Sequence, residues 1–338
     1  MRALRDPLAA TAGQRSIALH IFLLDLAFLL SLAVTIPTLA EQTSLPRIAA
    51  IIPSSGAHER ALREELQERG YVDGRNVRLD FRLYRTYDEA VQRQAKELVA
   101  SKPDVIVAYG TPAARALLDA TSTIPIVFAV GDPVASGLVS NLVRPGKNAT
   151  GMSVMALDLA PKAIEVLLQI APEARKIVAI RNRANPIGVQ MVEAAQAAGR
   201  GVGIQIEPVD VRSVSDLEAA VPAIRRSRAD AIFIHADLSF QSDRQRVVRA
   251  ILATGLPAVF QDHVFTEAGG LMSYGHNNRE ATRIVVSYVD RILKGAKPGE
   301  LPVEQATKVR LVINMKAAKE LGINIPQALL LRADEVIQ

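Results

Sequence analysis

Two stretches of the chain repeat the same order of strands and helices, and this internal repeat constrains the fold more than any other feature. The first opens with an apolar segment at 47–52, and the amphipathic segment that follows ends at Gly70. The second opens with the apolar segment 176–180, and its amphipathic segment ends at Gly199. Because glycine commonly terminates helices, both stretches are predicted to begin with a strand and a helix.

The correspondence continues through two further pairs of apolar segments. Residues 103–108 match 229–234, and 124–128 match 256–260, in the same order within stretches of roughly 100 residues. Short apolar strands that alternate with helices are typical of the parallel sheets of α/β proteins. We therefore expect an α/β fold of two similar Rossmann-like lobes, each built on a parallel sheet.

The segments that follow the predicted strands are candidate walls of a ligand site. In parallel α/β sheets, ligands bind beyond the carboxyl ends of the strands. These segments are 53–58, 109–113, 129–137, 181–187, 235–242 and 261–267. If the two lobes face each other, all six segments converge on one cleft.

Several classes of catalytic site lack their sequence signature. The chain has no Gly-x-Gly-x-x-Gly between a strand and a helix, no Walker A loop and no Gly-x-Ser-x-Gly elbow. It has no cysteine, and its five histidines include no i, i+4 pair of the kind that binds zinc on a helix. His235 and His263 both follow strands and could form polar walls of the cleft, and a metal-binding pair is the alternative. We expect no cofactor, no metal and no catalytic residue, and thus no enzyme.

The charge of the chain is mildly basic, with a net charge of +5 and a pI near 9.5. No run of lysine and arginine interleaves with aromatic residues, and zinc-finger spacings do not occur. Nucleic-acid binding proteins concentrate basic residues in such patches. We therefore expect no nucleic-acid partner.

The N-terminus has the order of a secretory signal. Three arginines precede the apolar run 17–34, and a small-residue cleavage site ends at Ala40. Asp25 interrupts the run, which is nearly long enough to span a bilayer, so an uncleaved membrane anchor is the alternative. We predict that residues 1–40 form a signal peptide and that the protein resides in the periplasm.

Two polar residues at strand ends have both structural and functional interpretations. Asp132 precedes Pro133, where it can cap a helix or hold the loop through an Asx-type turn. It can also face the cleft and pair with a ligand ammonium. Thr111 opens a predicted helix, whose N–H groups suit a carboxylate or another anion, and plain capping is the alternative. The sequence leaves these alternatives open.

Three separated blocks of the chain resemble one known family. They are IPIVFAVGDPVASGLVSNLVRPGKNATG (124–151), GGLMSYGHNN (269–278) and the C-terminal segment 291–338. All three resemble the substrate-binding proteins of ABC transporters associated with tryptophan and tyrosine uptake. The resemblance extends over residues 46–338. It implies a type I periplasmic-binding-protein fold, in which a three-strand hinge joins two lobes.

The resemblance also implies the division of the chain. Lobe I would contain 46–150 and 271–308, and lobe II would contain 151–270 and 309–338. The turn at 145–151 would be the first crossing between them. The implied ligand-binding residues are Ser54, Ser55, Gly110, Thr111 and Asp132 from lobe I, and Asn185, Asp237 and Asp262 from lobe II.

The chain departs from the pattern expected of the family in two loops. One is the polar loop 235–240, and the other contains Arg181 and Arg183. An arginine near the cleft would favour an acidic ligand, because guanidinium groups bind carboxylate and phosphate well.

The combined prediction is a solute-binding protein of an ABC importer. It would bind an amino acid or a related carboxylate between the lobes by hinge closure. Its partners would be a small-molecule ligand and a membrane permease, and it would act as a monomer. The alternatives are an exported α/β enzyme that uses Asp132 with His235, and a sensory ligand receptor.

Overall fold

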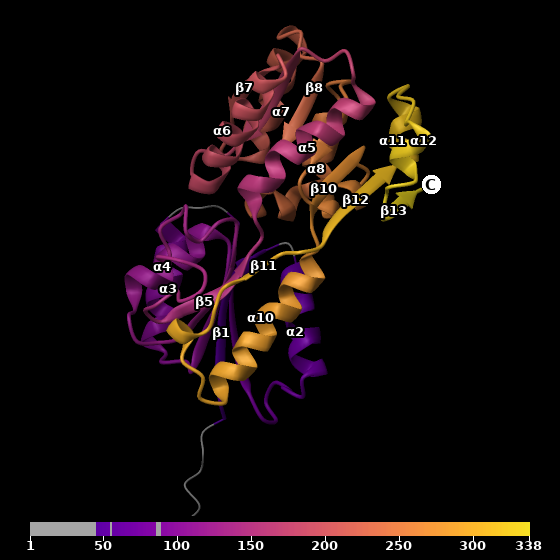
Figure 1. Cartoon of the computed structure of the whole chain (residues 1–338). Helices are drawn as coiled ribbons and strands as arrows, with labels where there is room; N and C mark the ends of the chain where they lie inside the picture. The colour runs from indigo at the N-terminus through magenta and orange to yellow at the C-terminus, as the bar shows by residue number, and fades with distance from the viewer. Residues whose placement is uncertain (1–44, 55, 86–88) are drawn as a thin grey trace, which may run out of the picture. The chain divides into compact units, whose positions relative to one another are not determined.

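A computed structural model describes residues 45–54, 56–85 and 89–338, so the predicted signal peptide and Ser55 lie outside the described residues. The described chain forms two sheets, each flanked by helices (Figure 1). We name the first sheet and its helices lobe I, and the second sheet and its helices lobe II.

The sheet of lobe I has the strand order β11-β5-β4-β3-β1-β2, and all neighbouring strands are parallel. Its central strands are apolar and buried over their whole length, as expected where helices cover both faces of a parallel sheet. The strands are β1 (Arg47–Pro53), β2 (Arg78–Tyr84), β3 (Val105–Tyr109), β4 (Ile126–Val130), β5 (Ala149–Ser153) and β11 (Glu304–Gln305).

The sheet of lobe II has the order β13-β12-β10-β9-β8-β6-β7. Its first five strands in the chain, β6 to β10, occupy the same relative places as β1 to β5, which confirms the two predicted similar lobes. Only β12 runs antiparallel to its neighbour β10 among the described strands. The strands are β6 (Lys176–Arg181), β7 (Gln205–Asp210), β8 (Ala231–Ile234), β9 (Ala258–Phe260), β10 (Met272–His276), β12 (Val309–Asn314) and β13 (Glu335–Ile337).

Helices connect these strands in both lobes. Lobe I contains α2 (Ala57–Glu68), α3 (Glu89–Ala100), α4 (Thr111–Ala120), α10 (Asn278–Leu293) and the 3-10 helix η2 (Pro298–Glu300). Lobe II contains α5 (Ala156–Ile170), α6 (Pro186–Gly201), α7 (Val214–Arg226), the 3-10 helix η1 (Leu238–Asp243), α8 (Arg244–Leu252), α9 (His263–Glu267), α11 (Met315–Glu320) and α12 (Gln327–Leu330). Of the helices in residues 45–54, 56–85 and 89–338, none combines the length and hydropathy that crossing a bilayer requires.

Strand β1 shows how the sequence builds a core on both faces of its sheet. Side chains alternate along a strand, so Ile48 and Ile52 face one side and Ile51 faces the other. The first face packs against α2 and α10, which lie side by side (Figure 1), and the second packs against α3 and α4. Most polar positions of these helices remain toward solvent, but His58, Glu65, Thr111 and Thr282 are buried.

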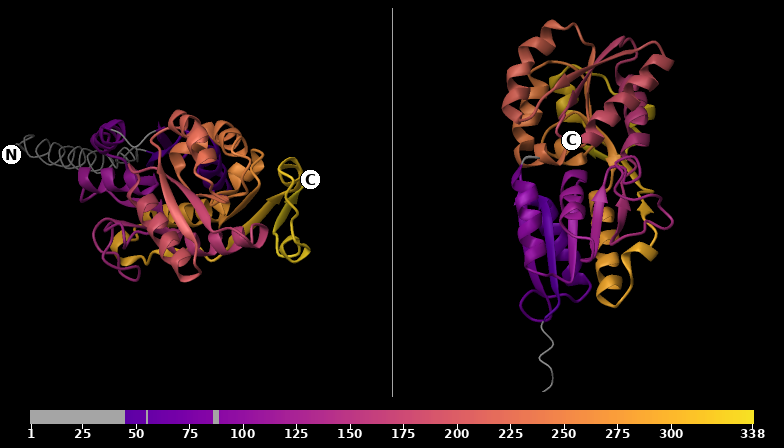
Figure 2. Two further views of the ribbon diagram at one scale, coloured as in Figure 1. Left: turned by 90° about the horizontal axis from the view of Figure 1, so that it is seen from above. Right: turned by 90° about the vertical axis from the view of Figure 1, so that its left-hand side faces the viewer.

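The chain passes between the two sheets three times. It leaves lobe I after β5, returns to it after β10, and leaves it again between β11 and β12. The crossings are residues 154–155, residue 277 and residues 306–308. The chain then ends in β13, the edge strand of the lobe II sheet (Figure 2).

Strand pairing moves the predicted boundaries by a few residues. Residues 151–153 were predicted for lobe II, but they belong to β5, which pairs with β4 in lobe I. Residues 272–276 were predicted for lobe I, but they form β10 and pair with β9 and β12 in lobe II. The first crossing therefore follows Ser153 rather than the turn at 145–151. Hydrogen bonding between strands decides where each lobe ends, and the residues of the turn do not indicate which strands pair.

Candidate ligand-binding cleft

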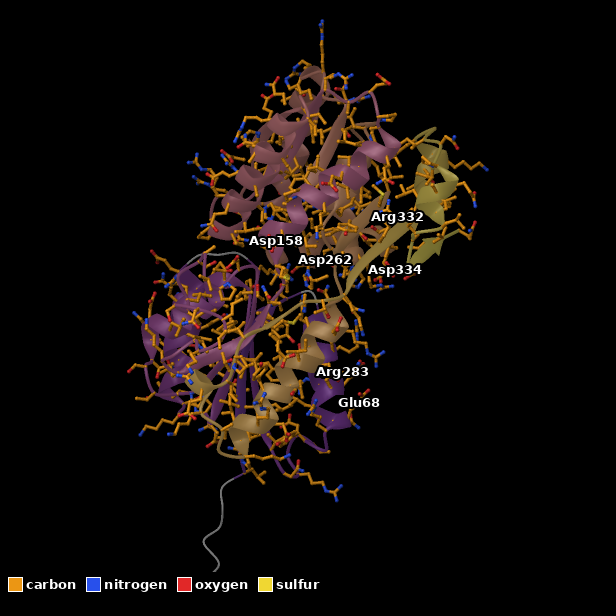
Figure 3. The ribbon with its side chains drawn as sticks, in the orientation of Figure 1. Glu68, Asp158, Asp262, Arg283, Arg332 and Asp334 are labelled. Atoms are coloured by element: carbon orange, nitrogen blue, oxygen red, sulfur yellow. The ribbon has the colours of Figure 1, made fainter. Side chains whose placement is uncertain are left out.

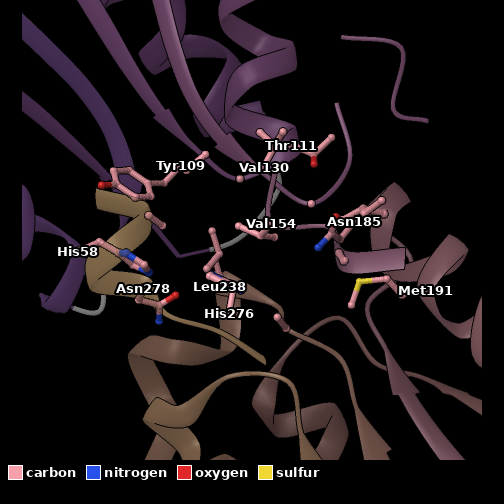
Figure 4. A pocket seen from close by; sticks show the side chains of 17 residues that line it. His58, Tyr109, Thr111, Val130, Val154, Asn185, Met191, Leu238, His276 and Asn278 are labelled. Atoms are coloured by element: carbon pink, nitrogen blue, oxygen red, sulfur yellow. The ribbon is translucent and has the colours of Figure 1, made fainter. Parts of the chain in front are cut away.

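A cavity lies between the two lobes at the carboxyl ends of the strands, where the predicted loops converge (Figure 4). Its volume of about 60 Å³ is several times the ~10–15 Å³ that one water requires. It is therefore large enough for part of a small organic ligand. Its labelled lining residues are His58, Tyr109, Thr111, Val130, Val154, Asn185, Met191, Leu238, His276 and Asn278.

Most of the cavity wall is apolar. Tyr109, Val130, Val154, Ile187 and Met191 all belong to its lining. No Asp, Glu, Lys or Arg belongs to the lining formed by the described residues. An apolar wall with a few placed polar groups is the usual construction of a small-molecule site.

In the lobe I wall, the backbone at the start of α4 lies close to the side chain of Tyr84. Gly110 has φ +90°, and a Cβ added there would lie 2.8 Å from the hydroxyl of Tyr84. That hydroxyl donates a hydrogen bond of 2.9 Å to the carbonyl oxygen of Tyr109. Thr111 is 5% exposed, and its Oγ1 is buried without a hydrogen-bond partner. Both predicted residues therefore line the cavity, and Thr111 presents an unused hydroxyl.

The lobe II wall is set by Asn185 and the buried carboxylate behind it. Asn185 is 4% exposed, and its Nδ2 lies 3.5 Å from Oδ2 of Asp237. Its Oδ1 is buried without a partner. Asp237 is fully buried and accepts hydrogen bonds from the backbone N–H of Ser239 at 2.8 Å and from its hydroxyl at 2.5 Å. The loop thus offers an acceptor to the cavity with a negative charge close behind it.

Asp132 occupies the capping position that the sequence left open. Its Oδ1 accepts hydrogen bonds from the N–H groups of Val134 and Ala135 at 3.0 and 2.9 Å. Gly131 lines the cavity, but Asp132 does not. His235 is 1% exposed and stacked beneath Gly188, where a Cβ would lie 2.6 Å from the ring. The suggested pair of Asp132 with His235 is therefore not a feature of the cavity.

Arg181 and Arg183 also lie outside the cavity lining. Nε of Arg181 lies 2.5 Å from Oδ1 of Asp210, and Nη1 of Arg183 lies 3.5 Å from its Oδ2. These arginines neutralise a carboxylate at the end of β7. They therefore give no reason to expect an acidic ligand, in contrast to the sequence-based argument.

A hydrogen-bonded chain joins the lobes beside the cavity. His58 of α2 donates from Nε2 to Oε1 of Gln241 at 2.9 Å, and Gln241 donates to Asp262 at 2.5 Å. Asn278, at the start of α10, donates to the other oxygen of Asp262 at 3.1 Å. Figure 3 shows Asp262 at the side of lobe II that adjoins lobe I. Asp262, predicted as a ligand contact, therefore holds the lobes together here.

A second contact between the lobes involves Ser54. Its Oγ lies 2.8 Å from Oγ of Ser242, and Ser54 is not part of the cavity lining. The sequence-based prediction placed it among the ligand contacts. In this structure it lies between the lobes, in the same way as Asp262.

The prediction of site residues omitted several lining side chains. His276 and Asn278 fall in the block GGLMSYGHNN, and His58 falls in the first predicted loop. The family block and the strand-end loop could therefore have identified these three residues as candidates for the site. Met191 lies on the second turn of α6, and no sequence signal distinguishes it from a core residue.

Sequence comparison decides the family. The sequence profile of the family described as ABC transporter substrate binding protein matches residues 48–337. The chain belongs to this family. A relative named tyrosine-binding protein, from Clostridioides difficile (strain R20291), is 26% identical over 273 residues, which are 80% of this chain and 78% of that protein.

Several solved structures share the fold of this substrate-binding protein. An ABC domain from Streptococcus pneumonia in complex with L-Trp has a TM-score of 0.80 and 30% identity, and the match covers 87% of this chain and 100% of that chain. A 5-methylthioribose transporter solute binding protein from Thermotoga lettingae also shares the fold, with 13% identity and a TM-score of 0.59. This match covers 86% of this chain and 93% of that chain. The relatives are solute-binding proteins and not enzymes, in agreement with the sequence-based prediction.

Burial controls the charge of the histidines around the cleft of the substrate-binding protein. It lowers the pKa of His58 and His235, and it lowers that of His276 to about 4. For Asp262, burial acts against ionisation, but His263, His276, the backbone N–H of Val264 and His58 together outweigh it, and its pKa lies below the usual value. Near neutral pH the cleft therefore combines neutral imidazoles with an ionised carboxylate.

We expect the free energy of unfolding to decrease as the pH falls from about 6.5 toward 4. In this range the unfolded chain binds protons at histidines that remain neutral in the folded protein. Each such histidine adds at most about 1.4 kcal/mol per pH unit to the slope. Asp262 contributes only at lower pH, since a lowered carboxyl pKa stabilises the fold above the unfolded value near 3.9.

Urea titrations between about pH 7 and 4.5 test this expectation. The His276→Asn variant should show a shallower decrease than the wild type. Parallel curves for the two proteins would contradict the assignment of a lowered pKa to His276.

Proposed function

We propose that this substrate-binding protein delivers an amino acid with a large apolar side chain to an ABC importer. The observation that carries the proposal is that Thr111 and Asn185 line the apolar cavity, and that their side-chain oxygens, Oγ1 and Oδ1, are buried without a hydrogen-bond partner. A buried polar group without a partner costs free energy. A ligand that supplies a donor and an acceptor at these points removes that cost.

The two polar points match the two ends of an amino-acid backbone. The ligand ammonium donates to Oδ1 of Asn185, and the buried carboxylate of Asp237 offsets its charge. The hydroxyl of Thr111 donates to the ligand carboxylate. The apolar side chain lies against Tyr109, Ile187 and Met191, and a methionine sulfur packs well against an aromatic ring.

The relatives support the same ligand class. One is named for tyrosine binding, and another was solved with L-Trp. Among the predicted site residues, we propose Gly110, Thr111 and Asn185 as ligand contacts, with Asp237 behind Asn185.

The three crossings and the contacts between the lobes support a mechanism of hinge closure. The pairs Ser54–Ser242 and His58–Gln241 must separate when the lobes open. A ligand held by both Thr111 and Asn185 favours the closed state, because only that state supplies both contacts. We also propose a periplasmic location after removal of residues 1–40, a membrane permease as partner, a monomeric state and no role with nucleic acid.

The test is ligand binding by residues 41–338, refolded to remove any bound compound. The chain contains no tryptophan, so the emission of added L-tryptophan can be followed against tyrosine alone. Calorimetry with L-tyrosine, L-tryptophan and L-phenylalanine should give one-to-one binding with a Kd of about 1 μM or lower, and the ligand should be recovered unchanged.

We expect Thr111→Val to weaken this binding by about 10- to 100-fold, because the variant removes one buried hydrogen bond to the ligand. Thr123→Val is the matched control, since Thr123 is exposed in the loop after α4. Equal affinities for the two variants, or no binding by any amino acid of the panel, would argue against the proposed function.

A further inference from the structure

A second cavity adjoins the ligand-binding cavity on the side of α3 and α4. Its volume is about 230 Å³, and we call it the outer cavity. Gln92, Thr111, Arg115 and Ser136 contribute from lobe I, and Ala184 and Pro186 contribute from lobe II. Like the inner cavity, it is therefore formed only when the lobes are together.

The two cavities meet at Thr111. Thr111 lines both of them, and Asn185 of the inner cavity lies in sequence between the two lobe II residues of the outer one. Arg115 follows Thr111 by four residues on α4, so the two side chains share one face of that helix. A ligand group that leaves the inner cavity past Thr111 therefore comes to Arg115.

The outer cavity has hydrogen-bond donors with no anion to receive them. Arg115 donates to the carbonyl oxygens of Ser136 and Gly137. No carboxylate of residues 45–54, 56–85 or 89–338 forms an ion pair with it, whereas Arg181 and Arg183 share Asp210. The hydroxyl of Ser136 is buried and lacks a partner.

An arginine with spare N–H groups beside an unused hydroxyl is well suited to a carboxylate. Guanidinium groups form strong, charge-assisted hydrogen bonds with carboxylates. The wall also limits what can bind, since the two lobe II residues and Ala116 are apolar. The only formal charge of the described lining is that of Arg115, and it is positive.

We infer that the outer cavity is a carboxylate subsite, with Arg115 as the residue that selects ligands whose carboxylate, held at Thr111, is free and negatively charged. The inference rests on the proposed function, which it extends by naming the residue that separates amino acids from their uncharged derivatives. The apolar body of the ligand stays in the inner cavity, and its carboxylate, which accepts a hydrogen bond from Thr111, extends toward Arg115 and Ser136.

The test compares L-phenylalanine with L-phenylalaninamide, which has nearly the same shape but no negative charge. Calorimetry on the wild type should show tighter binding of the acid. In Arg115→Gln the affinity for the acid should fall by about 10- to 100-fold, as for a lost charged hydrogen bond, while that for the amide stays unchanged. Arg200→Gln is the control, because it removes one positive charge from the exposed end of α6.

A purely structural role for Arg115 predicts a different result. Arg115 also tethers the loop at Ser136 and Gly137, and loss of that tether would weaken the acid and the amide equally. Equal loss, or no loss with either compound, would overturn the carboxylate subsite and leave the proposed function intact.

Failure of the wild type to bind either compound would instead count against the proposed function. The subsite then has an independent readout, the Nε–Hε resonance of Arg115, assigned by its disappearance in Arg115→Gln. A saturable shift of this resonance on titration with sodium acetate would support a carboxylate subsite. An unchanged resonance would overturn it.

Discussion

Replacement of Asn185 by leucine should lower the affinity for an amino acid at least 100-fold, or by about 2.7 kcal/mol. Asn185 Oδ1 is the buried, unpartnered acceptor of the lobe II wall. Leucine has a similar volume, so it fills the same space but leaves the ligand ammonium without an acceptor. Burying an unpaired charge beside an apolar side chain is costly. Calorimetry with L-tyrosine measures the loss.

The stability of the Asn185→Leu variant should change little. The contact from Nδ2 to Asp237 is long at 3.5 Å, and Asp237 keeps its hydrogen bonds from Ser239. Asn182→Ala is the matched control in the same loop, because Asn182 is buried at 2% exposure and bonds to Ser239 without lining the cavity. The control should lose stability but retain affinity. Wild-type affinity in Asn185→Leu would contradict the proposed ligand orientation.

Replacement of Gly275 by alanine should lower the free energy of unfolding by about 3 kcal/mol or more. Gly275 lies in β10, and a Cβ at this position would be 1.9 Å from the carbonyl oxygen of Gln261 and 2.7 Å from its carbon. These are backbone atoms, so no side-chain rotation can relieve the overlap. Strand β10 would have to move away from β9, next to the crossing at residue 277. Urea denaturation of the variant measures the loss.

Gly201→Ala is the control for this prediction. Gly201 ends α6, and a Cβ added there meets no atom within 4 Å. Alanine is the better helix former, by up to about 1 kcal/mol in a helix interior, so this variant should be as stable as the wild type or slightly more stable. Equal unfolding midpoints for Gly275→Ala and the wild type would show that the sheet adapts to the added carbon.

Local sequence signals were sufficient for the elements of the fold. The apolar segments 47–52 and 176–180 became β1 and β6, within one residue at each end. The repeat of apolar segments predicted two similar lobes, because burial of both faces of a parallel sheet requires continuous apolar strands. The loops that follow these strands supplied Thr111 and Asn185, which line the cavity.

The same signals were insufficient wherever a polar residue had more than one possible partner. Asp132 and Asp237 both follow strands, yet one caps the turn at Val134 and the other lies buried behind Asn185. Arg181 and Arg183 were expected to influence the ligand, but both pair with Asp210 outside the cavity lining. The partner of a charged side chain is chosen in three dimensions.

The sequence by itself therefore determined the two α/β lobes, the strand-end loops that line the cleft and the absence of known catalytic motifs. These depend on patterns within a few residues of one another. Only the tertiary structure decided the crossings, the chain from His58 to Gln241 and Asp262, and the outer cavity at Arg115. His58 and Gln241 are 183 positions apart. Contacts at such a separation form when packing of the two lobes brings their loops together, and no local periodicity encodes them.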